Sequence, residues 1–323
     1  MIIVTGGAGF IGSAYIWYLN SLGKDNIFVV DKLRNKNKWK NLVNVNFYDF
    51  IDKENIDNLL ENNNIKISSI IHMGACSSTV ETNVDYFIEN NYKYSQRIWN
   101  YASKNKCDLI YASSAATYGN GNLGFDDNIF KLKPLNPYGF SKYIFDNWVL
   151  KQVQQKNVPR KWAGLKFFNV YGPNEYHKNN MASVIFHAFN QISQTNKMKL
   201  FKSYNKDFKH GYQLRDFIYV KDIVKIIDFF RSKSKVSGIF NCGTGKPNSF
   251  YDLVKFTFKA MNKKENIKFI DMPISIRDKY QYYTKAELGK LKDAGYIKSF
   301  YSLESGVNDY VTNYLLKDDK YLN

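Results

Sequence analysis

A glycine-rich turn near the N-terminus constrains the fold more than any other feature of the chain. An apolar run over residues 2–5 comes directly before this turn, and helix-forming residues follow it over residues 11–22. The apolar spacing predicts a buried strand and then a helix. A strand that passes through a tight turn into a helix begins a β-α-β unit, so we expect a parallel sheet.

Short apolar runs alternate with helical stretches along the first half of the chain. We expect strands at residues 2–5, 27–31, 43–48, 69–73, 109–113 and 163–169, with helices such as 11–22 and 86–104 between them. This alternation predicts an α/β fold: a doubly wound parallel sheet of the Rossmann type with helices on both faces.

The second half of the chain has a different pattern. Beyond about Tyr171 the alternation weakens, and prolines and long polar stretches appear. We therefore expect a dinucleotide-binding Rossmann domain over residues 1–170 and a smaller C-terminal α/β domain, mainly substrate-binding, over residues 171–323. The two are interleaved, because a strand-like run at 240–243 indicates that about residues 216–245 return to the first sheet.

The glycines of the first turn have the spacing of a dinucleotide-binding loop. Gly6 or the next glycine allows the turn, Gly9 lets a pyrophosphate approach the backbone, and Gly12 lets helix and strand pack closely. The first helical residues, Phe10 and Ile11, offer free N–H groups and a partial positive charge to phosphates.

Charged residues after the second expected strand bear on the choice of cofactor. Asp31 closes that strand, and its carboxylate is suited to accept a hydrogen bond from the adenosine ribose, which favours NAD over NADP. Lys32, Arg34 and Lys38 follow at once, and Lys53 lies beyond the next strand. Such cations could neutralise a 2′-phosphate. The residues alone therefore leave NAD and NADP both open.

Small residues follow the fourth expected strand: Gly74, Ala75, Cys76 and Ser77. Small side chains at the carboxyl edge of a parallel sheet let a cofactor lie across it. We expect Asn90, near the start of the next helix, to bond the backbone of this run. We interpret His72, on an apolar strand, as a core histidine.

A serine, a tyrosine and a lysine form a candidate catalytic set. Ser114 ends the fifth expected strand, and Tyr138 and Lys142 stand four residues apart, on one face of a helix. A phenol with a pKa of about 10 is a poor base, but a nearby ammonium favours its phenolate. Tyr138 would take a hydroxyl proton while hydride passes to a nicotinamide. Lys142 would hold the nicotinamide ribose, and Ser114 would bond the substrate oxygen.

Composition bears on several other classes of protein. Lys and Arg outnumber Asp and Glu by 46 to 29, but the lysines are dispersed, so we expect no nucleic-acid partner. We expect no membrane span and no export signal, and hence a cytoplasmic location, because long apolar runs and a basic leader are missing. The scattered cysteines have no zinc spacing, so we expect no metal.

Taken together, these residues resemble the extended short-chain dehydrogenases. Over nearly the whole length the chain is similar to the ADP-heptose 6-epimerase family, which makes the heptose donor for the lipopolysaccharide core. The narrower resemblance is carried by residues 74–79, 112–119, 167–173, 177–184 and 214–220.

The resemblance implies NADP rather than NAD, and transient oxidation at C6 of an ADP-heptose. It also implies a second acid/base residue, Lys178, because the hydride must leave one face of C6 and return to the other. Val170 and Lys178 are further cofactor contacts, and Lys38 and Lys53 match the phosphate-binding lysines. The substrate contacts implied besides Ser114 are Asn169, Asn180, His187, Phe201, Arg215 and Tyr280. A homo-oligomer is implied as well, with a pentamer as one form.

The chain also departs from the family pattern. Asn179 and Asn180 replace a small Gly-Ser pair, Lys32 replaces an asparagine, and residues 205–213 form a longer loop than in some members.

Alternative activities remain open. A UDP-hexose 4-epimerase shares the Ser/Tyr/Lys set but has no need of Lys178. A dTDP-glucose 4,6-dehydratase needs an acidic pair after the strand serine, where Ala115 and Ala116 stand. A non-catalytic dinucleotide-binding protein would typically lack the tyrosine or the lysine.

Overall fold

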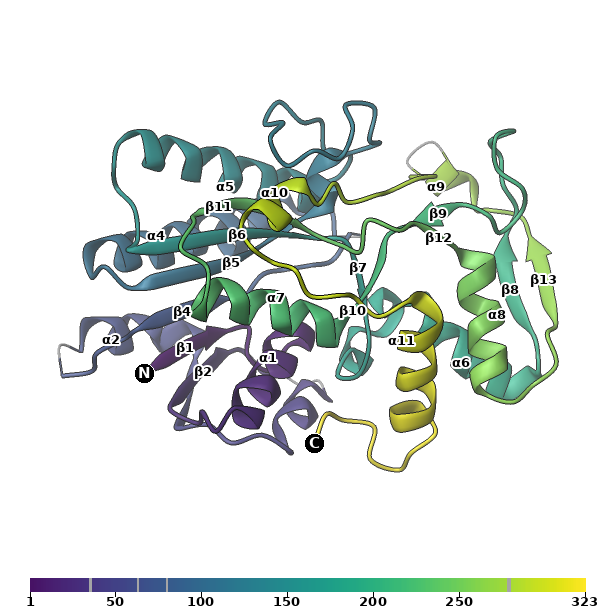
Figure 1. Ribbon diagram of the computed structural model, residues 1–323, viewed down its shortest axis with the longest axis horizontal. Helices are drawn as coiled ribbons and strands as arrows, with labels where there is room; N and C mark the ends of the chain where they lie inside the picture. Colours follow the sequence, from purple (N-terminus) through teal and green to yellow (C-terminus); the bar gives the residue numbers. More distant parts are fainter. Residues whose placement is uncertain (35–36, 63, 80, 278–279) are drawn as a thin grey trace.

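The computed structural model describes residues 1–34, 37–62, 64–79, 81–277 and 280–323. Within these residues, seven parallel strands form a central sheet in the order β11-β6-β5-β4-β1-β2-β3 (Figure 1). The strands are β1 (Ile2–Thr5), β2 (Ile27–Asp31), β3 (Asp49–Asp52), β4 (Ser69–His72), β5 (Asp108–Ser114), β6 (Lys161–Phe167) and β11 (Gly238–Cys242). The strand order runs outward in both directions from the boundary between β1 and β4. The predicted α/β class and doubly wound sheet are confirmed.

Helices cover both faces of this sheet. On one face lie α1 (Phe10–Ser21) and α7 (Val220–Ser232); on the other lie α2 (Ile56–Glu61), α4 (Tyr94–Lys104) and α5 (Pro137–Gln154). Successive strand residues divide between two apolar clusters, Val4 with the first face and Ile3 with the second. In the described part of the chain, no helix has both the length and the apolar character needed to cross a membrane.

Two expected elements have different bounds in the structure. The helix expected over 86–104 begins earlier, with α3 (Val84–Phe87), and passes through a π-helical turn (Ile88–Lys93) into α4. The strand expected over 163–169 divides at Phe168: β6 ends at Phe167, and β7 (Asn169–Tyr171) pairs with β10 (Phe217–Tyr219) instead.

The strand expected at residues 43–48 is wrong. This segment is irregular, and the third strand begins only at Asp49, which pairs with Phe28. Val43 is 63% exposed, and the side chain of Asn20 bonds both the N–H and the carbonyl of Asn46. Side-chain bonds to the backbone compete with ladder pairing, so the segment forms no strand, although Val45 packs into the core.

The C-terminal part contains small two-stranded sheets and helices. β9 (Leu214–Arg215) pairs with β12 (Asn248–Ser249), and β8 (Met198–Phe201) pairs with β13 (Ile267–Ile270). The helices are α6 (Val184–Thr195), α8 (Phe250–Ala260), α9 (Ile274–Arg277), α10 (Gly289–Asp293) and α11 (Leu303–Tyr310). The run expected to return to the first sheet does so as β11, an edge strand parallel to β6. The domain boundary at residue 170 stays a prediction.

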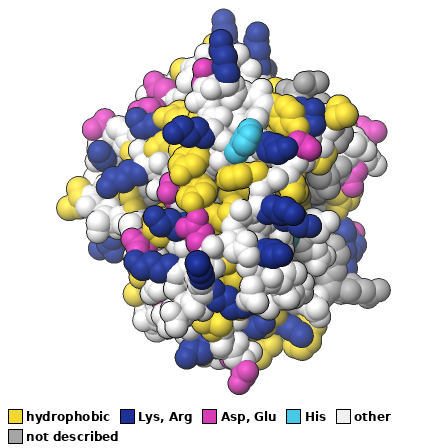
Figure 2. Space-filling view, turned by 90° about the vertical axis from the view of Figure 1, so that its right-hand side faces the viewer, with side chains coloured by type: hydrophobic (Ala, Val, Ile, Leu, Met, Phe, Trp, Pro, Cys, Tyr) yellow, Lys and Arg dark blue, Asp and Glu magenta, His cyan; other side chains and the backbone are white. Residues whose placement is uncertain are grey.

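The outer end of this part carries dispersed positive charge. Figure 2 shows the face formed beyond α8, β8 and β13, where lysine and arginine side chains are scattered among apolar and acidic ones. This pattern agrees with the dispersal of lysines along the sequence.

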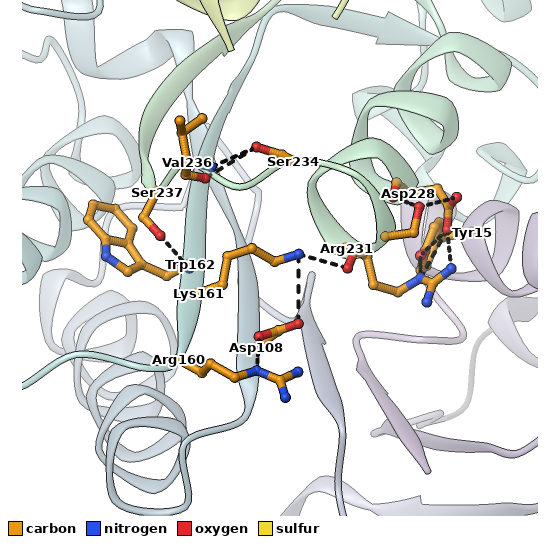
Figure 3. A network of polar contacts seen from close by, with 11 residues as sticks. Tyr15, Asp108, Arg160, Lys161, Trp162, Asp228, Arg231, Ser234, Val236 and Ser237 are labelled. Carbon is orange, nitrogen blue, oxygen red and sulfur yellow. Dashed lines mark hydrogen bonds and ion pairs between the residues drawn. The ribbon is translucent and has the colours of Figure 1, made fainter. Parts of the chain in front are cut away.

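A polar network ties helices to the amino ends of the strands, far from the carboxyl edge (Figure 3). Lys161, at the start of β6, donates to the carbonyl of Arg231 on α7 at 2.9 Å. The Arg231 guanidinium in turn donates to Asp228 and to the hydroxyl of Tyr15 on α1. The network therefore joins the sheet, α7 and α1.

Candidate active site

The glycine turn after β1 is closely packed and fits a dinucleotide. Gly6 has φ +65°, and a Cβ there would lie 2.6 Å from the nitrogen of Gly74. A Cβ on Gly12 would lie 2.2 Å from the carbonyl oxygen of Gly6. Gly9 is the N-cap of α1 and offers no side-chain cap, so the N–H groups of the first turn, including Phe10 and Ile11, are available to phosphate oxygens.

Asp31 ends β2 beside this turn and is surrounded by cations. Its carboxylate accepts from the N–H of Ala8 at 2.9 Å and from Lys38 Nζ at 2.5 Å. Lys32 pairs with Glu54 at 2.8 Å. Burial lowers the pKa of the Lys53 amine, Glu54 opposes that effect, and Lys32 and neighbouring arginines add to it. The structure thus gathers Lys32, Lys38 and Lys53 around the end of β2.

The small-residue run after β4 is held by Asn91 rather than by Asn90. Asn91 accepts from the N–H of Cys76 at 2.7 Å and donates to the Cys76 carbonyl at 2.9 Å. Asn90 instead accepts from Lys53 Nζ at 2.6 Å. The expected backbone contact of Asn90 is wrong by one residue, because the π-helical turn places Asn91 toward the run. Gly74, Ala75 and Ser77 lie on this run, partly or fully accessible.

His72 is a core histidine, as interpreted from the sequence. Ser95 donates to the carbonyl of Asn91, so His72 Nε2 must donate to Ser95 Oγ at 2.9 Å. Nδ1 then accepts from the Thr5 hydroxyl at 2.6 Å, and Thr5 accepts from the N–H of Gly74. Burial lowers the pKa of His72 to about 3, so the ring is neutral in this chain of bonds.

The predicted Ser/Tyr/Lys set meets at the carboxyl end of β5. Asn136 caps α5 by accepting from the N–H of Gly139 at 2.8 Å, with Pro137 in the first turn. This start places Tyr138 beside Ser114. Burial raises the pKa of the Tyr138 phenol, and its side-chain hydrogen bond with Ser114 lowers it.

Lys142 follows Tyr138 by one turn and is buried. Its Nζ donates to the carbonyl of Ala112 at 2.8 Å. Burial lowers its pKa to about 8, and the charge of Asp146, one turn further along α5, opposes that effect. A lysine with this pKa exchanges a proton near neutral pH and can stabilise a phenolate while charged.

Lys178 lies in a 3₁₀ segment (Tyr176–Met181). Its Nζ is 5.4 Å from the ring centroid of Phe10, the first residue of α1. Burial lowers its pKa, and the buried carboxylate of Glu175 opposes that effect. Asn179 adopts φ +50° and ψ −124°, outside the left-handed helical region and in a conformation that favours glycine, and Asn180 is exposed. Among the described residues, Lys178 and Tyr138 share no direct hydrogen bond.

Two of the predicted substrate contacts lie together in the C-terminal part. The guanidinium of Arg215 is 5.4 Å from the ring centroid of Tyr280, and it donates to the carbonyls of Leu214 and Gln281. Burial lowers the pKa of Arg215. A buried guanidinium beside a tyrosine suits a diphosphate, because it can donate two parallel hydrogen bonds to phosphate oxygens.

Asn169 lies close to this pair, since its N–H donates to the carbonyl of Asp216, the residue after Arg215, at 3.0 Å. Asn169 and Val170 begin β7, just beyond the residue of β6 that pairs with Ser114. His187 lies on α6 and Phe201 ends β8. Within the described residues, no hydrogen bond or ring contact joins His187, Phe201 or Asn180 to Arg215. No three His, Cys, Asp or Glu side chains of that part of the chain gather as a metal site.

Several residues of the site were missed from the sequence. They are Asn91, Asp146, Lys166, Glu175 and Asp216, all buried. The sequence did offer a signal for Lys166, because a charged residue within an apolar strand indicates a buried polar contact. Asp216 accepts from the backbone of Thr244, Gly245 and Ala286, and so anchors loops beside Arg215.

Comparison with known proteins agrees with this geometry. Residues 2–243 match the NAD dependent epimerase/dehydratase family. The chain is 51% identical to the ADP-L-glycero-D-manno-heptose-6-epimerase of Fusobacterium nucleatum, with 100% of both chains covered. It is 48% identical to the protein of the same name from Brachyspira hyodysenteriae, with 96% of both covered.

Solved structures give the same result. The crystal structure of the Helicobacter pylori ADP-L-glycero-D-manno-heptose-6-epimerase superposes with a TM-score of 0.81 at 28% identity, covering 97% of this chain and 95% of that one. A UDP-N-acetylglucosamine 4-epimerase from Methanobrevibacter ruminantium has a TM-score of 0.83 at 23% identity, with 96% of each covered, and shares the fold. The resemblance predicted from the sequence is confirmed, and the chain belongs to the NAD dependent epimerase/dehydratase family.

Proposed function

We propose that this chain is an ADP-heptose 6-epimerase, which interconverts ADP-D-glycero- and ADP-L-glycero-D-manno-heptose for the lipopolysaccharide core. The observation that carries the proposal is a second amine at the site. Lys178 lies at the first residue of α1, in addition to Tyr138 and Lys142 on α5. The full-length relatives that bear this name support the same substrate.

Inversion at C6 assigns a task to each side chain. An oxidised nicotinamide, held beside Tyr138 by Lys142, would supply the redox chemistry by accepting the hydride of C6 and later returning it. Tyr138 takes the proton of the C6 hydroxyl as the C–H bond breaks, which leaves a ketone at C6. Ser114 donates a hydrogen bond to that oxygen. After the ketone has turned to present its other face, Lys178 donates the proton that restores the hydroxyl.

The cations at the ribose end favour NADP. Lys38 already pairs with Asp31, so that carboxylate carries less free negative charge toward a 2′-phosphate. Lys32 and Lys53 lie near the same position. Charge-assisted hydrogen bonds to a phosphate are among the stronger polar contacts in proteins. We therefore assign NADP, with NAD as the weaker ligand.

The C-terminal part supplies the substrate contacts. Arg215 and Tyr280 are suited to bind the diphosphate of ADP-heptose, and Asn169 the sugar end. His187, Phe201 and Asn180 complete the substrate set by resemblance. The same resemblance supports a homo-oligomer and a cytoplasmic location.

One comparison of substrates tests the proposal. Purified protein is incubated separately with ADP-D-glycero-D-manno-heptose and with UDP-galactose, and the sugars are followed by NMR. We expect the ADP-heptose to reach an equilibrium of its two C6 epimers and the UDP-galactose to remain unchanged. Conversion of UDP-galactose to UDP-glucose, with ADP-heptose untouched, would make the chain a UDP-hexose 4-epimerase instead.

A further inference from the structure

An ion pair lies buried next to the candidate catalytic helix. Lys166 Nζ is 2.8 Å from Asp146 Oδ2, and the two side chains are 2% and 5% exposed. Lys166 lies near the carboxyl end of β6, where it pairs in register with Ser113 of β5. Asp146 follows Lys142 by one turn of α5, so the two residues share a helix face.

Both oxygens of the Asp146 carboxylate accept hydrogen bonds. Oδ1 accepts from the hydroxyl of Tyr111 at 3.1 Å, and Oδ2 accepts from the hydroxyl of Ser113 at 2.7 Å. Both donors lie on β5, the strand that ends in Ser114. The carboxylate therefore fixes α5 to this strand and has a defined position relative to Lys142.

Lys166 extends the same link to the turn that carries Ser114. Its Nζ donates to the hydroxyl of Thr117 at 2.8 Å, and that hydroxyl donates to the carbonyl of Ser114 at 2.8 Å. The Nζ also lies 5.1 Å from the ring centroid of Tyr118. The ion pair thus contacts both elements that hold the candidate catalytic groups.

The carboxylate of Asp146 acts on two ammonium groups: it pairs with that of Lys166, and its charge raises the pKa of Lys142. A buried ion pair loses its hydration, and apolar side chains of similar volume often stabilise a core as well or better. Packing alone therefore does not explain charges at this place. What charged side chains change here, and apolar ones would not, is the protonation of Lys142.

We propose that Asp146 is a positioning residue for the reaction: held by Lys166, it keeps Lys142 protonated beside Tyr138 and fixes the Ser114 turn. This inference rests on the proposed function, because it assumes that charged Lys142 serves the Tyr138 phenolate. Asp146 acts through Lys142 and does not touch the substrate.

Other titratable groups lie around this region: His72 on β4, Cys76 after β4, Tyr111 on β5, Tyr118 after β5 and Lys166 on β6, with Tyr138 on α5 itself. α3 and the π-helical turn also pack against α5, and they carry Tyr86, Tyr92 and the exposed Asp85, Glu89 and Lys93. Burial keeps His72 neutral and raises the pKa values of the Tyr111 and Tyr118 phenols. Among these groups as described, the carboxylate that supports the charge of Lys142 is that of Asp146.

Two single substitutions should move the alkaline limb of activity in opposite directions. Asp146→Asn removes the anion, so Lys142 loses its proton at lower pH. The alkaline decline of kcat/KM should therefore begin at a pH lower by about one unit or more. Lys166→Met removes the competing cation, so Lys142 keeps its proton to higher pH, and the limb should rise. A purely structural role would reduce kcat without moving the limb in opposite directions.

The double variant Asp146→Asn/Lys166→Met covers the case in which an unpaired charge prevents folding of a single variant. We expect its limb below that of the wild type, because the Asp146 charge raises the pKa of Lys142 directly, whereas Lys166 is linked to Lys142 through Asp146. The matched control is Asp228→Asn/Arg231→Met, which removes the pair shown in Figure 3 at the opposite edge of the sheet. This control should keep the wild-type limb.

The pH dependence of NADP affinity is measured alongside turnover, because Lys142 is expected to contact the nicotinamide ribose. This second readout needs no sugar substrate. Absence of ADP-heptose turnover in the wild type would contradict the proposed function, while the NADP titrations still test the role of Asp146. Limbs that stay at the wild-type pH in all three Asp146 and Lys166 variants would overturn the inference.

Discussion

At the scale of single residues, burial moves the proton affinities of the candidate catalytic groups in opposite directions. It raises the pKa of Tyr138, lowers that of Lys142 to about 8, and lowers that of Lys178. The ordinary pKa values of the phenol and the Lys142 amine, 10.0 and 10.5, are nearly equal, so burial moves the two groups apart. The hydrogen bond with Ser114 opposes this change, because it lowers the pKa of the phenol that must take a proton from the sugar hydroxyl.

Replacement of the phenol tests its role directly. Tyr138→Phe removes the acid/base group and keeps the ring, so kcat should fall by about 10²- to 10⁴-fold, while bound NADP is retained. Steady-state kinetics and cofactor content measure both. Tyr143→Phe, on the same helix, is the control with expected wild-type rates. Activity of Tyr138→Phe within tenfold of wild type would remove the phenol from the mechanism.

Lys178 is tested by an uncharged side chain of similar length. Lys178→Met should slow epimerisation by about 10²-fold or more, because the second face of the ketone loses its proton donor. Thermal unfolding should change little, since the side-chain stem still packs near Phe10. Lys259→Met, at an exposed ion pair with Glu304, serves as control. Normal rates for Lys178→Met would exclude it from the site.

The proposed preference for NADP over NAD also depends on single residues. Lys38→Met and Lys53→Met should each weaken NADP binding by about tenfold or more, since a charge-assisted contact is worth about 1.5–3 kcal/mol. NAD binding should change much less. Titrations with both dinucleotides give the ratio, and Lys40→Met, beside Trp39, is the control. An unchanged ratio in both variants would argue against a 2′-phosphate site there.

At the scale of elements, the glycine turn, β5 and the start of α5 could be predicted from local signals. Residues close together in the chain determine both the glycine turn and the Tyr/Lys pair on one helix face. The third strand could not be placed, because Asn20 bonds the backbone of Asn46 from a distant helix. Asn91 was missed in favour of Asn90 because a π-helical turn shifts the helix phase by a residue.

The bond chain from Thr5 through His72 to Ser95 links β1, β4 and α4, and it predicts acid sensitivity. His72 has a pKa of about 3 when folded and an ordinary value of 6.5. The unfolded chain therefore binds the proton first, so this stabilisation is present above pH 6.5 and is lost as the pH falls toward 3. Each pH unit of that window costs up to about 1.4 kcal/mol.

His72→Gln keeps a donor and an acceptor but cannot take up that proton. The free energy of unfolding, measured by urea titration, should fall less steeply between pH 6.5 and 4 in this variant than in the wild type. Equal slopes for the two proteins would show that His72 does not control acid unfolding.

At the scale of the whole molecule, the site combines groups from both halves of the chain. Ser114, Tyr138 and Lys142 stand on the parallel sheet and its helix, whereas Lys178 and Arg215 come from the second half. Local sequence patterns could identify these groups but could not show which of them meet. Long-range pairing decides that, as in the return of β11 to the edge of the sheet beside β6.

The central claim is that the hydrogen removed from C6 returns to C6 of the same sugar, on the other face. ADP-heptose carrying deuterium at C6 tests this when the reaction runs in ordinary water and the product is read by NMR and mass spectrometry. We predict inverted C6 that retains its deuterium. Inversion with deuterium replaced by solvent hydrogen, or no inversion at all, would contradict the account.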